Sequence, residues 1–424
     1  MKRSIAIVVL VMAIFFAISF VTNILDPLMP TLRSTFGITG FQAALMAFAF
    51  FSAYGLMSIP AGLLIERLGA RIVLVTGIAF SLTGACVFAL WPVYAVALPS
   101  LFTIAIGFAM LQVVINPLLR EAGGEANYAM WANVAQLVFG GASFVSPFVY
   151  AKIVSVHAET AGTPGQGGSW AWFMPEQAPW VGLYWIIAGL LAALLVVVSL
   201  IRIPASVLRD QDRIGSWQII RGMLGNRVLL WYFLGIFCYV GLEQGVALSI
   251  AQYLQDYHGI DPAKGGHVAV AWFWGSMLIG CAVGLVLLRF CDARHVLFIF
   301  AFGALCTLFA ALSLPSLGSQ IAFSMMGFWC SVMWPVIFAL ALNSFRSQHG
   351  AIAGVLCTGI MGGAVVPLLI GHLSDLVGLR FALLALMPAL GCIMAIAIRA
   401  RPLVRSGVGG DVTDGEPAPI KAVG

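Results

Sequence analysis

The stretch GIFCYVGLEQGVALSIAQYL, residues 235–254, is an apolar run with one ionisable side chain, Glu243, near its middle. About 20 apolar residues in a helix are enough to cross the hydrocarbon core of a bilayer. Similar runs recur along the chain of 424 residues, of which 62% are hydrophobic and 9% are charged, with a mean hydropathy of +1.03. A soluble domain is about half apolar and about a quarter charged. The composition therefore predicts a polytopic membrane protein.

The apolar runs predict an all-α fold with twelve transmembrane helices, at residues 5–29, 41–65, 71–91, 95–119, 128–154, 180–202, 227–254, 265–288, 295–313, 317–344, 350–374 and 379–399. The first run could be taken for a signal peptide. It lacks a small-residue cleavage site and continues into VTNILDPLMP, so we expect a retained first span. All eight cysteines lie in or beside apolar runs, which makes a disulfide framework an unfavourable interpretation.

The distribution of Lys and Arg predicts the orientation of the spans. If the N-terminus is cytoplasmic, 17 of the 21 Lys and Arg residues fall on the inner side and four on the outer side: Arg33, Lys152, Lys264 and Arg380. Cytoplasmic loops of membrane proteins are enriched in these residues. We therefore expect a multi-pass protein of the inner (plasma) membrane with both termini in the cytoplasm. The net charge of +5 needs no nucleic-acid partner.

Repeated features relate the two halves of the sequence. GLLIERLGAR begins at Gly62 and GLVLLRFCDAR at Gly284, 222 residues later, and prolines in spans four, five, ten and eleven repeat with offsets of 218 and 220 residues. One period of about half the chain predicts two pseudo-symmetric six-helix bundles. The expected division is a first bundle at 1–202, a cytoplasmic linker at 203–226, a second bundle at 227–400 and a disordered tail at 401–424.

Two acids lie within predicted spans. Glu243 comes 16 residues after Arg227, about 24 Å along a helix, which places it near mid-bilayer. A charge there costs about 3 kcal/mol on insertion scales, so such residues usually mark ion or proton routes. Asp26 lies in the outer part of span one, and Asn23, one turn away, is the position equivalent to Glu243 in the repeat. The alternatives are a protonated Glu243 that bonds neighbouring helices and an Asp26 in an exposed loop.

Uncharged polar side chains form a third group in the predicted spans. Amides offer a donor and an acceptor together, as the hydroxyl groups of a sugar require, although they also bond helices to one another. Four tryptophans, at positions 131, 272, 274 and 334, offer faces for stacking, and for any one of them lipid or core packing is the ordinary role. The predicted substrate-binding residues are Asn23, Gln112, Asn116, Asn133, Gln136, Gln244, Gln252 and Trp272.

The cytoplasmic loop after span two is predicted to be a conformational latch, formed by Gly62, Glu66, Arg67, Gly69 and Arg71. GHLSDLVGLR, residues 371–380, resembles this loop, but the helix count places it outside, and we expect no gating role from it. The six histidines have no metal-ligand spacing and the chain has no phosphate-binding loop, so we expect no metal, no cofactor and no ATP-driven step.

GLLIERLGAR resembles the loop signature G-x-L-x-D-R-x-G-x-R of the major facilitator superfamily, with Glu66 in place of Asp. LQVVINPLLREAGG, WANVAQLVFGG, FCYVGLEQGVALSIAQYL and CSVMWPVIFALAL together resemble the fucose–galactose–glucose:H⁺ symporter family over nearly the whole chain. The resemblance implies two six-helix bundles around a central cavity that opens to each side in turn, with a sugar at mid-membrane and H⁺ or Na⁺ moving with it.

The same resemblance assigns roles to individual residues. It implies that Asp26 is the acid of span one and that Asn133 and Gln136 are the amides of span five. Gln112 departs from the fucose permeases, which have a coupling glutamate there. The glucose/galactose branch has a Gln in span four and a Glu in span seven like Glu243, so the expected cation-coupling residues are Glu243 and Asp26.

The sequence thus predicts a secondary transporter, a monomer in the bilayer and not an enzyme, that imports a hexose or hexose derivative by symport with H⁺ or Na⁺. Proton-coupled efflux of drugs or metabolites is the main alternative. A membrane enzyme would need a nucleophile–base or metal cluster near one interface, and a sugar sensor without transport would differ only in lacking turnover.

Overall fold

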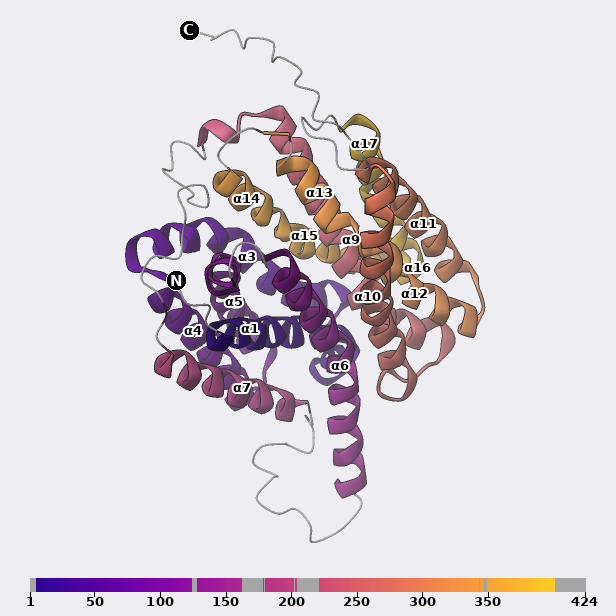
Figure 1. Ribbon diagram of the computed structural model, residues 1–424. Helices are drawn as coiled ribbons and strands as arrows, with labels where there is room; N and C mark the ends of the chain where they lie inside the picture. Colours follow the sequence, from indigo (N-terminus) through magenta and orange to yellow (C-terminus); the bar gives the residue numbers. More distant parts are fainter. Residues whose placement is uncertain are drawn as a thin grey trace.

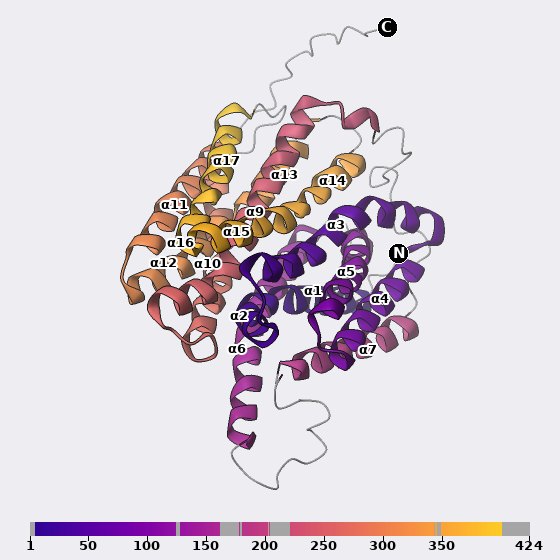
Figure 2. The same ribbon diagram turned by 180° about the vertical axis from the view of Figure 1, so that it is seen from behind.

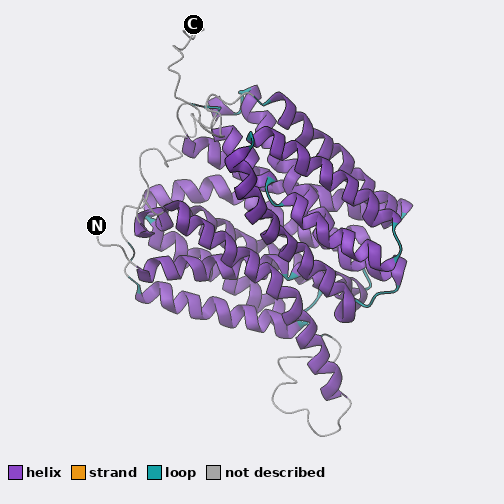
Figure 3. Cartoon of the chain, turned by 45° about the vertical axis from the view of Figure 1, so that its right-hand side comes forward, coloured by secondary structure: helices purple, strands orange, loops and turns teal. Residues whose placement is uncertain are grey.

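The computed structural model describes residues 5–123, 128–161, 178, 180–201, 203, 221–342, 344–345 and 349–400. Within these residues all regular secondary structure is helical (Figure 3). The expected linker, apart from Ile203 and residues 221–226, and the expected tail, 401–424, lie outside the described residues, as does most of the outer loop between spans five and six.

The helices of the N-terminal half are α1 (Ile5–Asn23), α2 (Leu25–Phe36), α3 (Gly40–Leu68), α4 (Ala70–Leu90), α5 (Tyr94–Gly123), α6 (Tyr128–Ala161) and α7 (Val181–Leu200). Those of the C-terminal half are α9 (Arg227–His258), η3 (Pro262–Gly266), α10 (His267–Phe290), α11 (Ala293–Ser313), α12 (Ser316–Cys330), α13 (Met333–Leu342), α14 (His349–Thr358), η4 (Gly359–Met361), α15 (Gly362–Val377), α16 (Leu379–Ala382), η5 (Leu383–Leu386) and α17 (Met387–Arg399).

Twelve helical stretches in the described residues are long and apolar enough to cross a membrane, which confirms the predicted number of spans. Five of these stretches contain more than one helical segment. The first consists of α1 and α2 and extends to Phe36, beyond the predicted end at residue 29, because Pro27 lies in the first turn of α2, where a helix tolerates proline.

Each half packs around its own hydrophobic core. One core consists of residues of α1 to α7, with Leu248 and Ala364 added from the other half, and the second consists of residues from Leu229 to Ala400. Figures 1 and 2 show the helices of the N-terminal half, in indigo to magenta, gathered on one side of the molecule and those of the C-terminal half, in rose to yellow, on the other. This is the predicted fold of two six-helix bundles.

The two halves meet chiefly along four helix pairs, in which α3 packs against α14 and α15, α6 against α10, and α2 against α9. At the ends of α3 and α15 that the sequence predicts to be outside, called the outer ends below, the backbones approach closely, since a Cβ on Gly371 would meet the Ala44 side chain and the Gly40 carbonyl. On the other flank, the rings of Phe148 and His267 lie 5.7 Å apart. The outer ends of the two halves are therefore in contact on both flanks.

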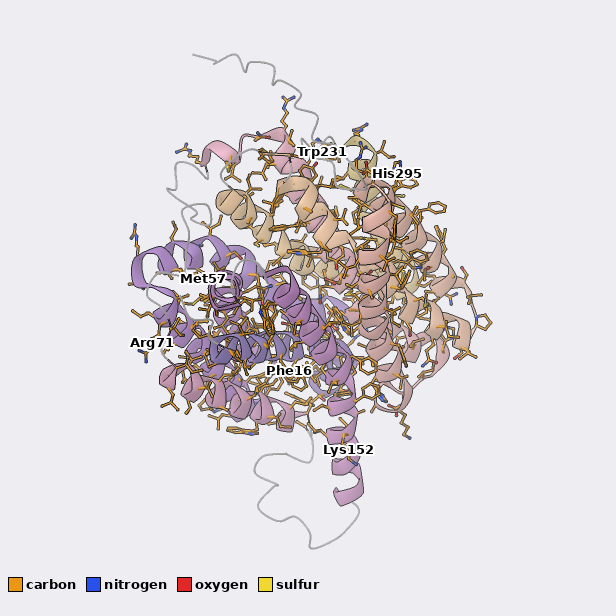
Figure 4. All side chains as sticks on the ribbon, viewed as in Figure 1. Phe16, Met57, Arg71, Lys152, Trp231 and His295 are labelled. Atoms are coloured by element: carbon orange, nitrogen blue, oxygen red, sulfur yellow. The ribbon has the colours of Figure 1, made fainter. Side chains whose placement is uncertain are left out.

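Two residues that the sequence predicts to lie on opposite sides of the membrane lie at opposite ends of one bundle. Figure 4 shows Arg71, predicted to be cytoplasmic, and Lys152, predicted to be outside, at opposite ends of the N-terminal half. In the same view Trp231 and His295, from the inner ends of α9 and α11, lie at one end of the C-terminal half.

Glycines in the C-terminal half let α12 lie against α10, and this contact predicts a stability effect. A Cβ on Gly327 would collide with the Phe273 carbonyl, whereas a Cβ on Gly189 of α7 meets no atom within 4 Å. Overpacking costs about 1–3 kcal/mol, and replacing an unhindered helix glycine by alanine contributes up to about 1 kcal/mol. We expect Gly327→Ala to lower the melting temperature in detergent by a few degrees and Gly189→Ala to leave it unchanged or raise it. Equal melting curves for the two variants would contradict this packing.

Candidate functional site

Several spans are interrupted at the depth of the predicted acids. The first span breaks at Ile24, two residues before Asp26, and the tenth breaks between Cys330 and Met333. Pro335 has no N–H for the Ser331 carbonyl, and the Cys281 thiol of α10 donates to that carbonyl instead, at 3.5 Å. Within a membrane, irregular backbone is tolerated only inside the protein or along a cavity, and transporters use such breaks at their binding sites.

Asp26 lies in the first turn of α2 and is fully buried, with 0% of its surface exposed. Its Oδ2 accepts a hydrogen bond from Nε1 of Trp274 on α10, at 2.9 Å, and its Oδ1 has no partner among the described residues. The bond joins the N-terminal half to the C-terminal half. The alternative of an exposed loop acid is therefore excluded.

Glu243 lies in the middle of α9 with a partner on its own helix. The hydroxyl of Tyr239, one turn earlier, donates to its Oε1 at 2.7 Å. Tyr239 is itself buried and packs against Trp334 of α13, with ring centroids 6.2 Å apart. The sequence did not single out Tyr239, although its position four residues before Glu243 places the two side chains on one helix face.

The two acids come from opposite halves, and α2 packs against α9. The carboxylates of Asp26 and Glu243 lie within electrostatic range of each other, and the thiols of Cys281 and Cys330 lie within range of Glu243. Asp26 is fully buried and Glu243 is half-buried, so two anions here repel each other more strongly than they would in water. The arrangement therefore favours a bound cation, such as a proton, between the halves.

Asn23 belongs to a buried hydrogen-bond cluster within the N-terminal half. Its Nδ2 donates to Oγ of Ser143 on α6 at 2.7 Å and lies 3.4 Å from Oγ of Ser19, and the two serine hydroxyls are 2.7 Å apart. These contacts hold α1 against α6 just before the break at Ile24. In this conformation Asn23 is thus a bond between helices that positions the segment bearing Asp26.

The structure places the predicted amides of spans four and five only in part. Gln112 is half-buried on α5. Asn116 lies on the same helix, and Asn133 and Gln136 lie on α6, but their side chains fall outside the described residues.

The two glutamines of α9 lie at different depths. Gln244 is buried, and its Cγ lies against Gly363 of α15, which also touches Phe51 of α3, so it sits where the two halves meet. Gln252 donates to Asp256 on its own helix at 2.6 Å. It lines a cavity of about 60 Å³ near the outer ends, together with Arg33 and Ser249.

Trp272 and its neighbour Trp274 face opposite ways. Trp272 is 49% exposed and packs edge-on against Phe144 of α6, at 5.6 Å between centroids. Trp274 is 2% exposed and bonds Asp26. The prediction that Trp272 contacts substrate stays a prediction, and the tryptophan that the structure joins to a predicted coupling residue is Trp274.

The predicted inner latch contains an unusual backbone turn. Gly69, with φ of 81°, links α3 to α4 in a conformation that favours glycine. Arg71 donates to the Ser199 carbonyl of the α7 end at 2.9 Å, within the N-terminal half, and Arg67 is exposed. Gly62 is buried on α3, and the Glu66 side chain falls outside the described residues.

The outer segment 371–380 forms contacts that the sequence did not predict. Gly378 has φ of 83° and links α15 to α16 as Gly69 links α3 to α4. The Asp375 carboxylate accepts from the backbone N–H groups of Gly40 and Phe41 at the start of α3, both at 2.8 Å, and lies 4.0 Å from Arg33. This segment therefore bridges the two halves, and the expectation that it has no gating role stays a prediction.

Arg380, five residues further on, holds the same end of the C-terminal half together. Its Nε donates to the Tyr253 hydroxyl at 3.0 Å, and its guanidinium lies over the Tyr257 ring at 4.9 Å from the centroid. Both tyrosines belong to α9, so Arg380 fastens the segment that follows Asp375 to α9. This holds Asp375 in position against the start of α3.

Twelve spans in two bundles, with a buried acid bonded across their contact, define a polytopic membrane protein of the two-bundle class. The family model of the Major Facilitator Superfamily matches residues 11–355. A glucose/galactose transporter of Brucella abortus biovar 1 (strain 9-941) is 30% identical over 382 residues, 88% of each chain. The L-fucose-proton symporter of Escherichia coli (strain K12) is 26% identical over 415 residues, 92% of each chain.

Solved structures agree in fold. The Major Facilitator Superfamily transporter FucP in its outward conformation matches with a TM-score of 0.66 at 24% identity, over 93% of this chain and 98% of that chain. A bacterial homologue of the human lysosomal transporter Spinster, inward-facing and unoccupied, matches with a TM-score of 0.74 at 14% identity, over 93% and 96%. The chain therefore belongs to the Major Facilitator Superfamily, in the fucose–galactose–glucose:H⁺ symporter family that its motifs indicate.

Proposed function

We propose that this protein imports a hexose or hexose derivative by symport with a cation, H⁺ in the first place, through alternating access of its two bundles. The observation that supports this most is Asp26, a fully buried acid bonded across the contact between the halves, within electrostatic range of Glu243 from the other half. The names of the relatives point to sugar substrates and, for the fucose symporter, to the proton.

Neutralisation of charge accounts for the coupling. Moving a bare carboxylate through a closed, apolar state is costly. A cation bound at Glu243 and Asp26 lifts that cost, so the loaded protein changes conformation more easily than the sugar-only form. The membrane potential contributes about 2.3 kcal/mol per charge per 100 mV, which corresponds to an accumulation of about 50-fold.

The moving parts in this proposal are the expected bundles at 1–202 and 227–400, which act as a monomer in the inner membrane with both termini cytoplasmic. The outer ends are in contact here, so this conformation corresponds to the state closed to the outside. Gln112, Asn116, Asn133, Gln136, Gln244, Gln252, Asn23 and Trp272 remain the proposed substrate residues, and Gly62, Glu66, Arg67, Gly69 and Arg71 the proposed inner latch. The alternative of efflux finds no support in the names of the relatives.

Uptake into proteoliposomes tests the function. A panel of radiolabelled D-glucose, D-galactose, L-fucose and an amino sugar is measured with an inward proton gradient, an inward Na⁺ gradient or no gradient. We expect at least one hexose to accumulate above equilibrium with the proton gradient and to equilibrate without it. Accumulation with the Na⁺ gradient alone would replace H⁺ by Na⁺ as the coupling ion. Failure of every sugar to accumulate under either gradient would contradict the proposal.

A further inference from the structure

The bond between Trp274 and Asp26 links the ionisation of Asp26, in the N-terminal half, to the position of the C-terminal half. Its donor and acceptor are 2.9 Å apart, and both side chains are buried. An indole N–H only donates, and a donated hydrogen bond stabilises an ionised carboxylate more than a neutral acid. The bond therefore offsets part of the cost of ionising the buried Asp26 for as long as the halves are together at this depth.

Trp274 is held firmly by its own half. Ser276, two residues later, donates to the Ser324 carbonyl of α12 at 2.6 Å, and Gly327 of α12 lies directly against the Phe273 backbone. The Trp274 ring packs edge-on against Phe273 at 5.2 Å between centroids. If the outer ends separate, Trp274 must move with α10 and leave Asp26.

We propose that Trp274 is a positioning residue for proton coupling, which donates to Asp26 when the outer side is closed and withdraws when it opens. This inference rests on the proposed proton symport. In the outer-closed state the donor lowers the cost of releasing the proton from Asp26 towards the inner side. In the outer-open state the carboxylate has no indole donor and takes a proton from outer water. The proton thus enters outside and leaves inside, in the direction of sugar import.

Among the described residues, no titratable group near Asp26 donates a hydrogen bond to it. Glu243 on α9 is the acid that interacts with Asp26 electrostatically, and its repulsion favours a proton on one of the two in either conformation. The elements packed against α2 carry further titratable groups, and these have other partners. Tyr54 of α3 stacks with Phe51, and Tyr150 of α6 bonds Thr31. His267 of α10 packs on Phe148, and Asp261 caps η3, which contains Lys264.

The test compares Trp274→Phe with Trp231→Phe, which makes the same change at an exposed position on the inner end of α9. Both are measured with D-glucose or D-galactose in proteoliposomes, as net uptake against a series of lumenal pH values and as sugar exchange at equal pH. Loss of one hydrogen bond to a charged group corresponds to about one pH unit. We expect Trp274→Phe to slow net uptake, to shift its inhibition by an acidic lumen upward by about one unit, and to retain exchange. Trp231→Phe should match the wild type.

A double variant sharpens the result. If Trp274 acts through Asp26, adding Trp274→Phe to Asp26→Asn produces no further shift of the pH profile. An unshifted profile in Trp274→Phe, or equal losses of net uptake and exchange, would overturn the inference. Should Trp274→Phe fail to fold, proton-driven net uptake by Asp26→Asn would overturn it as well. Absence of proton dependence in the wild type would instead contradict the proposed function, so the two failures are distinguishable.

Discussion

Glu243→Gln abolishes accumulation of sugar against its gradient, while sugar exchange at equal pH partly survives. Glutamine keeps the size of the side chain and an acceptor for the Tyr239 hydroxyl, now 2.7 Å from Oε1, but it cannot bind or release a proton. The accumulation ratio in proteoliposomes should fall from as much as about 50-fold per 100 mV to about one. The measurement is steady-state uptake with an imposed potential and proton gradient, followed by counterflow.

Asp256→Asn is the matched control. It removes a carboxylate from the same helix, at its exposed outer end, and should accumulate sugar within about twofold of the wild type, since charge changes at exposed positions have small effects. Full accumulation by Glu243→Gln, or by Glu243→Leu, would show that titration of this side chain is not part of transport. Equal loss of exchange and accumulation would point to substrate binding in place of coupling.

Asp375→Ala opens the outer side of the protein. The carboxylate bonds two N–H groups at the start of α3, where the helix dipole also favours an anion. Removing such a capping anion costs about 2 kcal/mol, which shifts the balance between outer-closed and outer-open states about 30-fold. Asp375→Asn, which keeps one acceptor oxygen, should shift it about fivefold.

Hydrogen–deuterium exchange in nanodiscs measures this shift. The informative peptides are residues 145–152 of α6 and 262–270 of η3 and α10, because they meet on the opposite flank and do not touch Asp375. We expect faster exchange there in Asp375→Ala. Asp292→Ala is the control, since Asp292 also caps a helix, α11, but bonds Arg294 within the C-terminal half. Faster exchange confined to residues 40–43 would mean a local loss of protection and no change of conformation.

Asp375 also makes a contact that the structure shows and the sequence does not predict. GHLSDLVGLR and GLLIERLGAR share the pattern of an acid, a glycine three residues later and an arginine two residues after that, and the turn glycines of both adopt φ near +80°. The resemblance was visible in the sequence, and so was the outer location. The partner of Asp375 lies 335 residues earlier in the chain, and no local pattern predicts that distance.

The two tryptophans of α10, within one helical turn of each other, show the same limit of prediction from sequence. Positions 272 and 274 are two residues apart, so they face nearly opposite sides of the helix. In a soluble helix the polar face would identify the exposed one. Here lipid and protein interior are equally apolar, so the sequence could not tell that Trp272 is half-exposed and that Trp274 reaches Asp26.

The sequence by itself determined the twelve spans, their expected orientation, the two related halves, the family and the presence of acids in apolar spans. These follow from span length, composition and motifs, which are properties of the chain in one dimension. Only the tertiary structure decided that Asp26 is buried and bonded to the opposite half, that Tyr239 holds Glu243, and that Asp375 joins the outer ends. Those contacts depend on how helices of similar apolar character rotate and pack, and van der Waals fit and single hydrogen bonds between distant residues determine that arrangement.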